Sequence, residues 1–355
     1  MRAPLSRRAA LESLASVPLL AGMGYGAQEN SRGDTSPAPS GAAFMPSDAS
    51  LKTLNGKLPI GTLGKLKVSR LILGGNPMAG GSHARDLIYV SSVLRAYHTE
   101  QKIFETLALA EGAGVNTVLL RSGQMPMFKK YCDLTHSKML TMCQVMPRDI
   151  HAFFAHPVCT PEVIQSFMTD IERAIDYGVN TIYVNGSFAE RLVQAGRFDL
   201  LARALDRIKS QGLSAGLGGH SIEVPIKCEK MGLLPDYYVK TLHHDQYWSA
   251  HPRQNRVEFS VDSPKRQDHD QFHDNIFDLF PEKTVEFMST VKRPWVAFKV
   301  LAGGAIHPQS GFKYAFGNGA DFICVGMLDF QIVEDVNLAL EVLPKCQKRA
   351  RAWYA

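Results

Sequence analysis

Residues 161–185 read PEVIQSFMTDIERAIDYGVNTIYVN, a helical pattern that ends at Gly178 and leads directly into a short apolar strand. Glycine commonly ends a helix because it adopts the left-handed backbone conformation without steric cost. The same succession recurs along the chain, and Gly112, Gly212 and Gly232 end other predicted helices. The repeating unit of this sequence is therefore a strand followed by a helix.

Eight such units are predicted between residues 57 and 345. The apolar strand patterns cover 71–75, 115–121, 140–146, 179–185, 214–220, 237–244, 295–301 and 322–327. The helical patterns cover 100–112, 124–136, 161–177, 188–211, 223–231, 282–291, 307–317 and 331–343. Alternating strands and helices are typical of parallel sheets, either closed into a barrel or open and doubly wound. The number of units favours a (β/α)8 TIM barrel.

The sequence divides into four parts. Residues 1–27 carry two arginines at positions 7 and 8 before an uncharged stretch, which predicts a twin-arginine export signal and a periplasmic or secreted location. An accidental arginine pair before a buried helix is the alternative reading. Residues 28–55 are rich in Ser, Pro, Gly and Ala, and predict a flexible linker. The barrel is assigned to 56–345 and a C-terminal tail to 346–355.

Composition narrows the classes of partner. The 355 residues carry a formal net charge of +5, and the basic residues are scattered, so nucleic acid is not an expected partner. The apolar run near the N-terminus is too short to span a bilayer, and no stable membrane insertion is expected. The six cysteines include no Cys-x-x-Cys pair, which argues against a zinc–thiolate site. A small molecule is the expected substrate.

Two predicted loops are longer than a barrel requires. One follows the first strand over 76–99, and the other follows the sixth strand over 245–281. Both leave the C-terminal ends of strands, where barrel enzymes build their active sites. His269 and His273 in the second loop have the spacing of a metal pair on a helix, although a solvated lid with incidental histidines is favoured.

A lysine interrupts each of two apolar strand patterns, YYVKTLHHD at 237–245 and WVAFKVLAGG at 295–304. Strand alternation places Lys240 on one face with His244, and Lys299 on the face of Ala297. A lysine packed against helices would cost several kcal/mol, so both side chains are predicted to point into a site. Buried lysines lose their proton readily, as amine chemistry on carbonyl compounds requires.

Polar residues also end the other predicted strands. Alternation turns Arg121, Gln144 and Asn185 toward the barrel axis, and His220 ends a glycine-rich strand. We predict that these four bind substrate and that Lys240, His244 and Lys299 are catalytic. Each of the seven taken singly is better explained as a satisfied polar group of the core, but their shared position at the strand ends favours a site.

Three glycines follow the last two predicted strands. Gly303, Gly304 and Gly326 lie where many barrels hold a phosphate or another anion through backbone N–H groups. An anion site and simple tight turns are equally supported here.

The stretch GTLGKLKVSRLILGG at 61–75, with AEGAGVNT at 110–117, resembles the opening of aldo/keto reductases. The resemblance implies a (β/α)8 barrel closed by an N-terminal hairpin and, by default, an NADP-dependent carbonyl reductase. The catalytic tetrad of that family is not retained. Arg121 replaces the aspartate of strand two, Gln144 the lysine of strand three, and Asn185 the histidine of strand four. An uncharged Gln144 cannot lower the pKa of a tyrosine by its charge.

The two lysine strands are similar to those of Schiff-base aldolases of the deoxyribose-phosphate type. This resemblance rests on Lys240-Thr241 and on Lys299 with Gly303-Gly304. It implies that Lys240 forms the imine, that Lys299 depresses its pKa, and that His244 is the acid or base. The histidines at 243 and 244 depart from that family's pattern.

Three functions stay open. The first and favoured one is proton-transfer or imine chemistry on a sugar or related carbonyl compound, as in a lyase, aldolase or isomerase. It would need no cofactor or a divalent metal, for which His220 and His244, with His98, are candidate ligands. The second is NADP-dependent carbonyl reduction. The third is a non-catalytic barrel that binds carbohydrate through Tyr183, Tyr247 and Trp248.

Overall fold

The computed structural model describes residues 41–84, 87, 89–148, 160–261 and 276–355. The predicted export signal and residues 28–40 of the predicted linker lie outside this part of the chain, as do His269 and His273. Export therefore stays a prediction, as does the second long loop as a solvated lid with incidental histidines, with a metal pair as its alternative.

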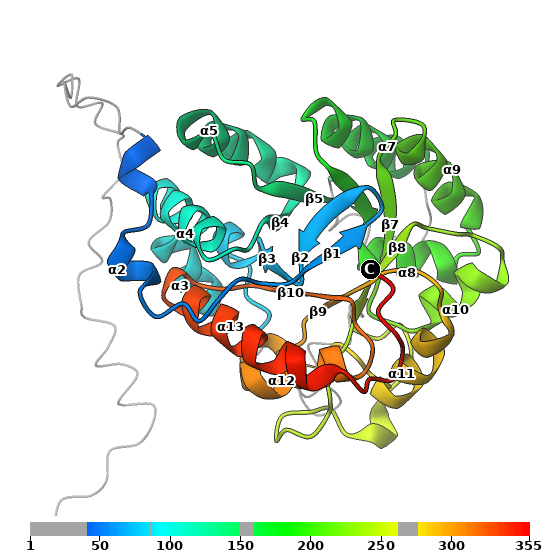
Figure 1. Ribbon diagram of the computed structural model, residues 1–355. Coiled ribbons are helices and arrows are strands. Elements are labelled where there is room, and N and C mark those ends of the chain that lie inside the picture. Colours follow the sequence, from blue (N-terminus) through cyan, green and yellow to red (C-terminus); the bar gives the residue numbers. More distant parts are fainter. Residues whose placement is uncertain (1–40, 85–86, 88, 149–159, 262–275) are drawn as a thin grey trace, which may run out of the picture. The chain divides into compact units, whose positions relative to one another are not determined.

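Eight parallel strands form a closed barrel, with β10 pairing back to β3 (Figure 1). They are β3 (Leu71–Gly74), β4 (Thr117–Arg121), β5 (Leu140–Val145), β6 (Thr181–Val184), β7 (Ser214–Gly219), β8 (Tyr237–Thr241), β9 (Trp295–Phe298) and β10 (Phe322–Val325). Every strand lies within a predicted strand pattern, and the predicted (β/α)8 barrel is confirmed.

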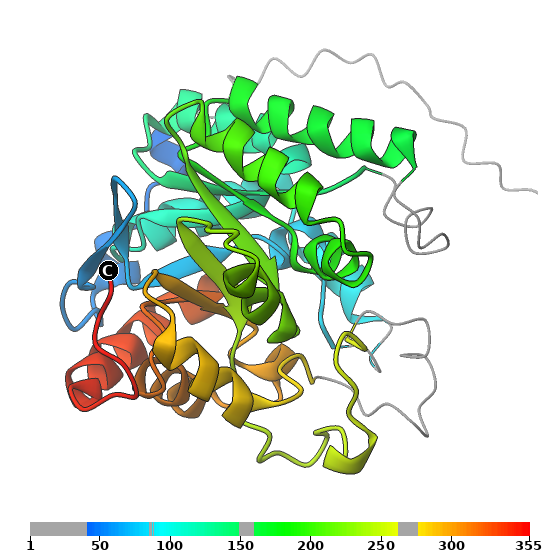
Figure 2. The ribbon, with the colours of Figure 1, turned by 90° about the vertical axis from the view of Figure 1, so that its right-hand side faces the viewer.

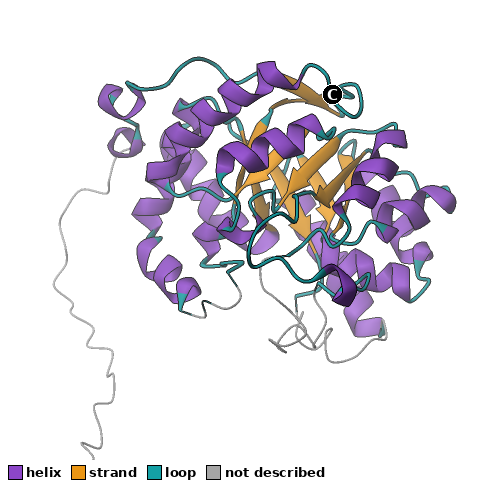
Figure 3. Cartoon of the chain, turned by 90° about the horizontal axis from the view of Figure 1, so that it is seen from below, coloured by secondary structure: helices purple, strands orange, loops and turns teal. Residues whose placement is uncertain are grey.

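Helices surround the strands, as the view from below shows (Figure 3). The main ones are α3 (Val90–Tyr97), α4 (Glu100–Gly112), α5 (Met125–Thr135), α7 (Pro161–Asp176), α8 (Gly186–Gln194), α9 (Phe198–Lys209), α10 (Glu223–Lys230), α11 (Pro281–Thr290), α12 (Pro308–Gly317) and α13 (Asp329–Val342). The single helix predicted over 188–211 is wrong, because Gly196 adopts φ 68° and separates α8 from α9. None of the described helices is both long enough and apolar enough to cross a bilayer.

Side chains of each strand alternate between two separate apolar layers. Val118 and Leu120 belong to the outer layer beneath the helices, whereas Met142 and Val239 belong to the layer inside the barrel. The hairpin of β1 (Ile60–Leu63) and β2 (Leu66–Ser69) adds Leu63 to the inner layer. The predicted N-terminal hairpin is therefore confirmed, and it closes one end of the barrel.

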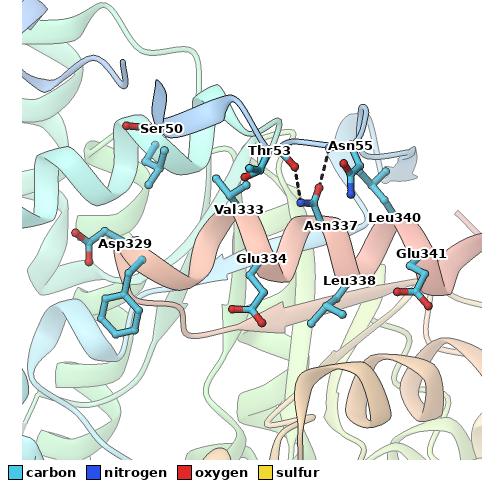
Figure 4. Close-up of a pocket in the computed structure, with 12 residues that line it drawn as sticks. Ser50, Thr53, Asn55, Asp329, Val333, Glu334, Asn337, Leu338, Leu340 and Glu341 are labelled. Atoms are coloured by element: carbon cyan, nitrogen blue, oxygen red, sulfur yellow. Dashed lines mark hydrogen bonds between the residues drawn. The ribbon is translucent and has the colours of Figure 1, made fainter. Parts of the chain in front are cut away.

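Residues 41–55 are folded, contrary to the linker predicted over 28–55. They form the short helices η1 (Gly41–Phe44) and α2 (Asp48–Leu51), and the Phe44 ring lies 5.2 Å from that of Phe104. The Asn337 side chain on α13 donates to Thr53 O and accepts from Asn55 N, both at 2.8 Å (Figure 4). A cavity of about 780 Å³ lies between this segment and α13. The local composition does not reveal these contacts, because the partner of Asn55 on α13 is 282 residues away in the sequence.

The predicted C-terminal tail, 346–355, also packs on the barrel. The chain ends beside the β1–β2 hairpin in two views (Figures 1 and 2). Asp321, which precedes β10 and is fully buried, accepts hydrogen bonds from Trp295 N at 2.9 Å and Tyr354 N at 2.8 Å. The guanidinium of Arg351 lies 3.2 Å from its carboxylate. A buried charge therefore fastens the tail to the N-terminal end of the barrel.

Candidate active site

Five of the predicted site residues lie at the C-terminal ends of barrel strands. Arg121 is the exposed last residue of β4, and it is paired in register with half-buried Gln144 of β5. Asn185 and Lys299 are half-buried just beyond β6 and β9, and His220 is buried just beyond β7. This end of the barrel therefore offers polar groups that water reaches.

The backbone at Lys299 decides where its side chain goes. Strand alternation alone would send it toward the helices with Ala297, but β9 ends at Phe298 and Lys299 has a left-handed φ of 56°. Its Nζ lies 3.0 Å from Nε2 of His220. A non-glycine residue in this conformation is strained, and such strain is concentrated at functional sites. The structure brings Lys299 and His220 into direct contact.

His220 is held by a buried carboxylate that the sequence analysis missed. Glu190 on α8 is 3% exposed, and its Oε1 accepts the backbone N–H groups of His220 and Ser221, the latter at 2.8 Å. The same oxygen lies 3.2 Å from Nδ1 of His220. With the Lys299 amine taken as the donor to Nε2, the ring proton is assigned to Nδ1, which lies near Glu190 without meeting hydrogen-bond geometry. Glu190 shares the buried stripe of Gly186 and Ala189, and a carboxylate on that stripe is the signal that could have identified it.

Phe277 is a further described neighbour of Lys299. The Lys299 Nζ lies 4.0 Å from the centroid of the Phe277 ring and 5.8 Å from that of Phe298. The Phe277 ring also contacts the ring of His83, and the two ring centroids lie 5.5 Å apart in an edge-on arrangement. The face of an aromatic ring attracts an ammonium, so the Phe277 ring holds the Lys299 side chain by a cation–π contact.

The predicted orientation of Lys240 is wrong. Its neighbours in alternation, Tyr238 and Leu242, lie in the outer apolar layer, and the Lys240 side chain is fully buried there. Its Nζ donates to Thr241 O at 2.9 Å and to Thr241 Oγ1 at 2.8 Å, and it forms an ion pair with Asp278 at 3.3 Å. These partners offset the cost of burying the charge, so no open site is needed to explain a lysine at this place.

His244 also lies apart from the Lys299–His220 pair in its described contacts. Its Nε2 is 3.1 Å from Ser310 Oγ, and its ring meets that of Tyr314 at 5.5 Å. The neighbouring His243 is fully buried, and its Nε2 accepts from the N–H groups of Phe277 and Asp278 at 3.0 and 2.9 Å. The sequence analysis placed no weight on His243, which fixes the backbone that carries Phe277.

The buried His243 predicts a pH dependence of stability. Burial lowers the pKa of its imidazole from 6.5 to about 3. Between these values the unfolded chain binds a proton that the folded chain does not, so stability contributed by this group is present above about pH 6.5 and lost toward about pH 3. We expect urea unfolding at about pH 7 and about pH 4.5 to show this loss, and a smaller loss in His243→Gln.

The prediction is judged by comparing the pH-dependent loss of stability in wild type with that in His243→Gln. This comparison is needed because the titration of Asp278 changes stability in the opposite direction. Burial raises the pKa of Asp278 from 3.8 to about 6, so its contribution to stability falls as pH rises between these values. Because the Asp278 N–H donates to His243, the comparison is repeated in the Asp278→Asn background, where this titration is absent. Equal losses in wild type and variant would contradict the assignment of the acid sensitivity to His243.

The proton relay of aldo/keto reductases does not fit the residues present. The amide of Gln144 donates to the hydroxyl of Tyr183 at 2.7 Å, and burial raises the pKa of Tyr183 well above its usual value. A phenol in this state is a poor proton donor to a carbonyl oxygen. Asn185, at the place of the family's histidine, caps α8 by accepting from Phe188 N at 3.1 Å. Among the described residues, Gln144, Tyr183 and Asn185 therefore do not form the proton relay of that family.

The predicted anion and metal sites gain no support from the geometry. Gly303 and Gly304 have left-handed φ values of 67° and 99°, as tight turns require. A Cβ at Gly326 would lie 2.8 Å from Pro77, so that glycine permits close packing. Within the described ranges, no three His, Cys, Asp or Glu side chains are grouped to hold a metal, and His220 and His244 belong to no such group.

Comparisons with known proteins support the fold. No protein-family model and no curated protein matches the sequence. A candidate aldo-keto reductase from Pseudomonas aeruginosa superposes with a TM-score of 0.51 at 15% identity, covering 81% of this chain and 98% of that chain. A candidate deoxyribose-phosphate aldolase from Coccidioides immitis has a TM-score of 0.41 at 9% identity, covering 84% of this chain and 99% of that chain. At such identities the likeness concerns architecture alone: the chain is a (β/α)8 barrel with aldo-keto reductases and an aldolase among its structural neighbours.

Proposed function

We propose that this chain is an enzyme that moves a proton next to the carbonyl group of a sugar or related small carbonyl compound. The observation that carries the proposal is the contact of Lys299 Nζ with His220 Nε2 at 3.0 Å, at the end of the barrel where such enzymes bind substrate. His220 is the proposed acid and base, and Lys299 the proposed cation for the substrate oxygen.

The proposed step follows from the donors and acceptors of the pair. Without substrate, the Lys299 ammonium occupies the lone pair of His220 Nε2. When the carbonyl oxygen of the substrate accepts the hydrogen bond from Lys299 instead, Nε2 of His220 is free. It can then accept a proton from the carbon next to the carbonyl group. The C–H electron pair then moves to form the enolate, whose oxygen charge Lys299 stabilises. The Glu190 carboxylate, 3.2 Å from Nδ1, is the negative charge beside the ring during this step. Protonation of the enolate oxygen, loss of the proton of the neighbouring hydroxyl and return of the carbon proton by His220 to the former carbonyl carbon complete an isomerisation.

Proton exchange in deuterated water tests this proposal. A panel of trioses, pentoses and hexoses, with their phosphates, would be incubated with the enzyme and followed by proton NMR. We expect loss of the signal next to the carbonyl of one compound with wild type and not with His220→Gln. Two results would overturn the proposal in different ways. Borohydride trapping of a carbonyl compound on Lys299 without exchange would indicate imine chemistry, and oxidation of NADPH would indicate reduction.

A further inference from the structure

Residues 276–280, here called the roof segment, carry Phe277 to the Lys299 ammonium. They join the long loop after β8 to α11 and pack in a small apolar cluster of their own with Val261. Two consecutive N–H groups of the segment donate to the buried His243, and Phe277 O lies 3.1 Å from Thr241 Oγ1. The roof segment is therefore attached to the end of β8 from several directions.

Asp278 is the charged anchor of the roof segment, and Lys240 is its cation. Both side chains are buried from solvent, with Asp278 only 1% exposed. Asp278 Oδ1 accepts from Thr284 Oγ1 of α11 at 2.8 Å and meets Lys240 Nζ at 3.3 Å. Its Oδ2 is buried with no hydrogen-bond partner among the described residues. A carboxylate placed in this way depends on its one described ion pair, because an unpaired buried charge is costly.

We propose that Lys240 is a positioning residue for the candidate active site. Through Asp278 it fixes the roof segment, so that the Phe277 ring stays on Lys299 and Lys299 stays at His220. The described partners of Lys240, Thr241 and Asp278, are themselves buried, and they connect the outer layer to the segment that carries the Phe277 ring. The inference rests on the proposed role of Lys299, but its test does not require turnover.

The test compares two variants with a matched control. Lys240→Met alone leaves Asp278 as an unpaired buried charge and risks unfolding, so the double variant Lys240→Met/Asp278→Leu removes both charges together. The control is Glu229→Gln, which removes a charge from contacts with Tyr238 and Arg293 in the same outer layer, without contact to the roof segment. Folding of each protein is checked by its Tm.

Two readouts report on the roof segment. Hydrogen exchange, followed by mass spectrometry over the peptide with residues 276–280, reports the N–H groups held by His243. Acetylation by acetic anhydride, mapped to Lys299, reports how well Phe277 covers the amine. We expect both rates to rise about tenfold in the folded double variant and to stay at wild-type values in Glu229→Gln.

Unchanged exchange and acetylation in the folded double variant would overturn the proposal. Faster exchange with unchanged acetylation would also overturn it, because the segment would then move without affecting Lys299. These outcomes are distinct from failure of the proposed function. A double variant that behaves as expected, in a protein that exchanges no proton of any sugar, would leave the positioning role intact and remove the reaction.

Discussion

Lys299→Met is expected to lower kcat on the true substrate by about 10²–10⁴-fold, with a much smaller change in KM. The ammonium at this place is the group that would stabilise the enolate oxygen, and methionine supplies neither charge nor donor. Methionine is unbranched and similar in length, so the Phe277 ring, whose centroid lies 4.0 Å from Lys299 Nζ, retains an apolar neighbour. The measurement is steady-state kinetics on the compound found in the exchange assay.

A matched control and a double variant sharpen this result. Lys313 is an exposed lysine on α12, and Lys313→Met is expected to retain wild-type kinetics. Because Lys299 and His220 are proposed to act together, Lys299→Met/His220→Gln should be little slower than either single variant. Retention of activity within about twofold in Lys299→Met would exclude the proposed mechanism.

Asp321→Asn is expected to lower the free energy of unfolding by about 3–5 kcal/mol. The carboxylate is fully buried, and the guanidinium groups of Arg349 and Arg351 lie 3.7 and 3.2 Å from it. Arg70 donates to the backbone oxygen of Asp321 at 3.0 Å and stacks on Trp353 at 4.4 Å. Asparagine keeps the shape of the side chain but leaves the buried arginines without their negative charge.

Urea unfolding at neutral pH measures this loss. Asp133→Asn is the control, because Asp133 forms an exposed pair with Lys129 at 2.9 Å and should change stability by less than about 1 kcal/mol. Similar small losses in both variants would show that Asp321 does not balance the arginine charges.

The sequence predicted the barrel well because its strands and helices carry local signals. Apolar runs and helix-ending glycines are read within ten or twenty residues, and each of the eight strands was found in this way. The two lysines differ in whether strand alternation determines the direction of the side chain. Lys240 follows the alternation of its strand and therefore faces the helices, where Asp278 neutralises it. Lys299 lies one residue beyond its strand, and a left-handed backbone turns it toward His220.

The remaining parts of the candidate site come from contacts that are distant in sequence. Phe277 meets Lys299 across 22 residues, since 299 − 277 = 22, and nothing in the sequence around Phe277 marks it as a neighbour of an amine. Glu190 meets the His220 N–H across 30 residues. Such pairs depend on how loops return over the barrel end, which alternation and composition do not determine.

The left-handed backbone at Lys299 also limits which sequences can occupy this position. Ala302, three residues further on, has φ 48°, so two non-glycine residues in the same short turn carry backbone strain. Glycine or asparagine would relieve that strain at position 299, and valine or isoleucine would increase it. Selection for stability alone would therefore remove a lysine here. Homologues that keep lysine would be those in which the amine is used, and homologues with glycine or asparagine would mark the loss of that use.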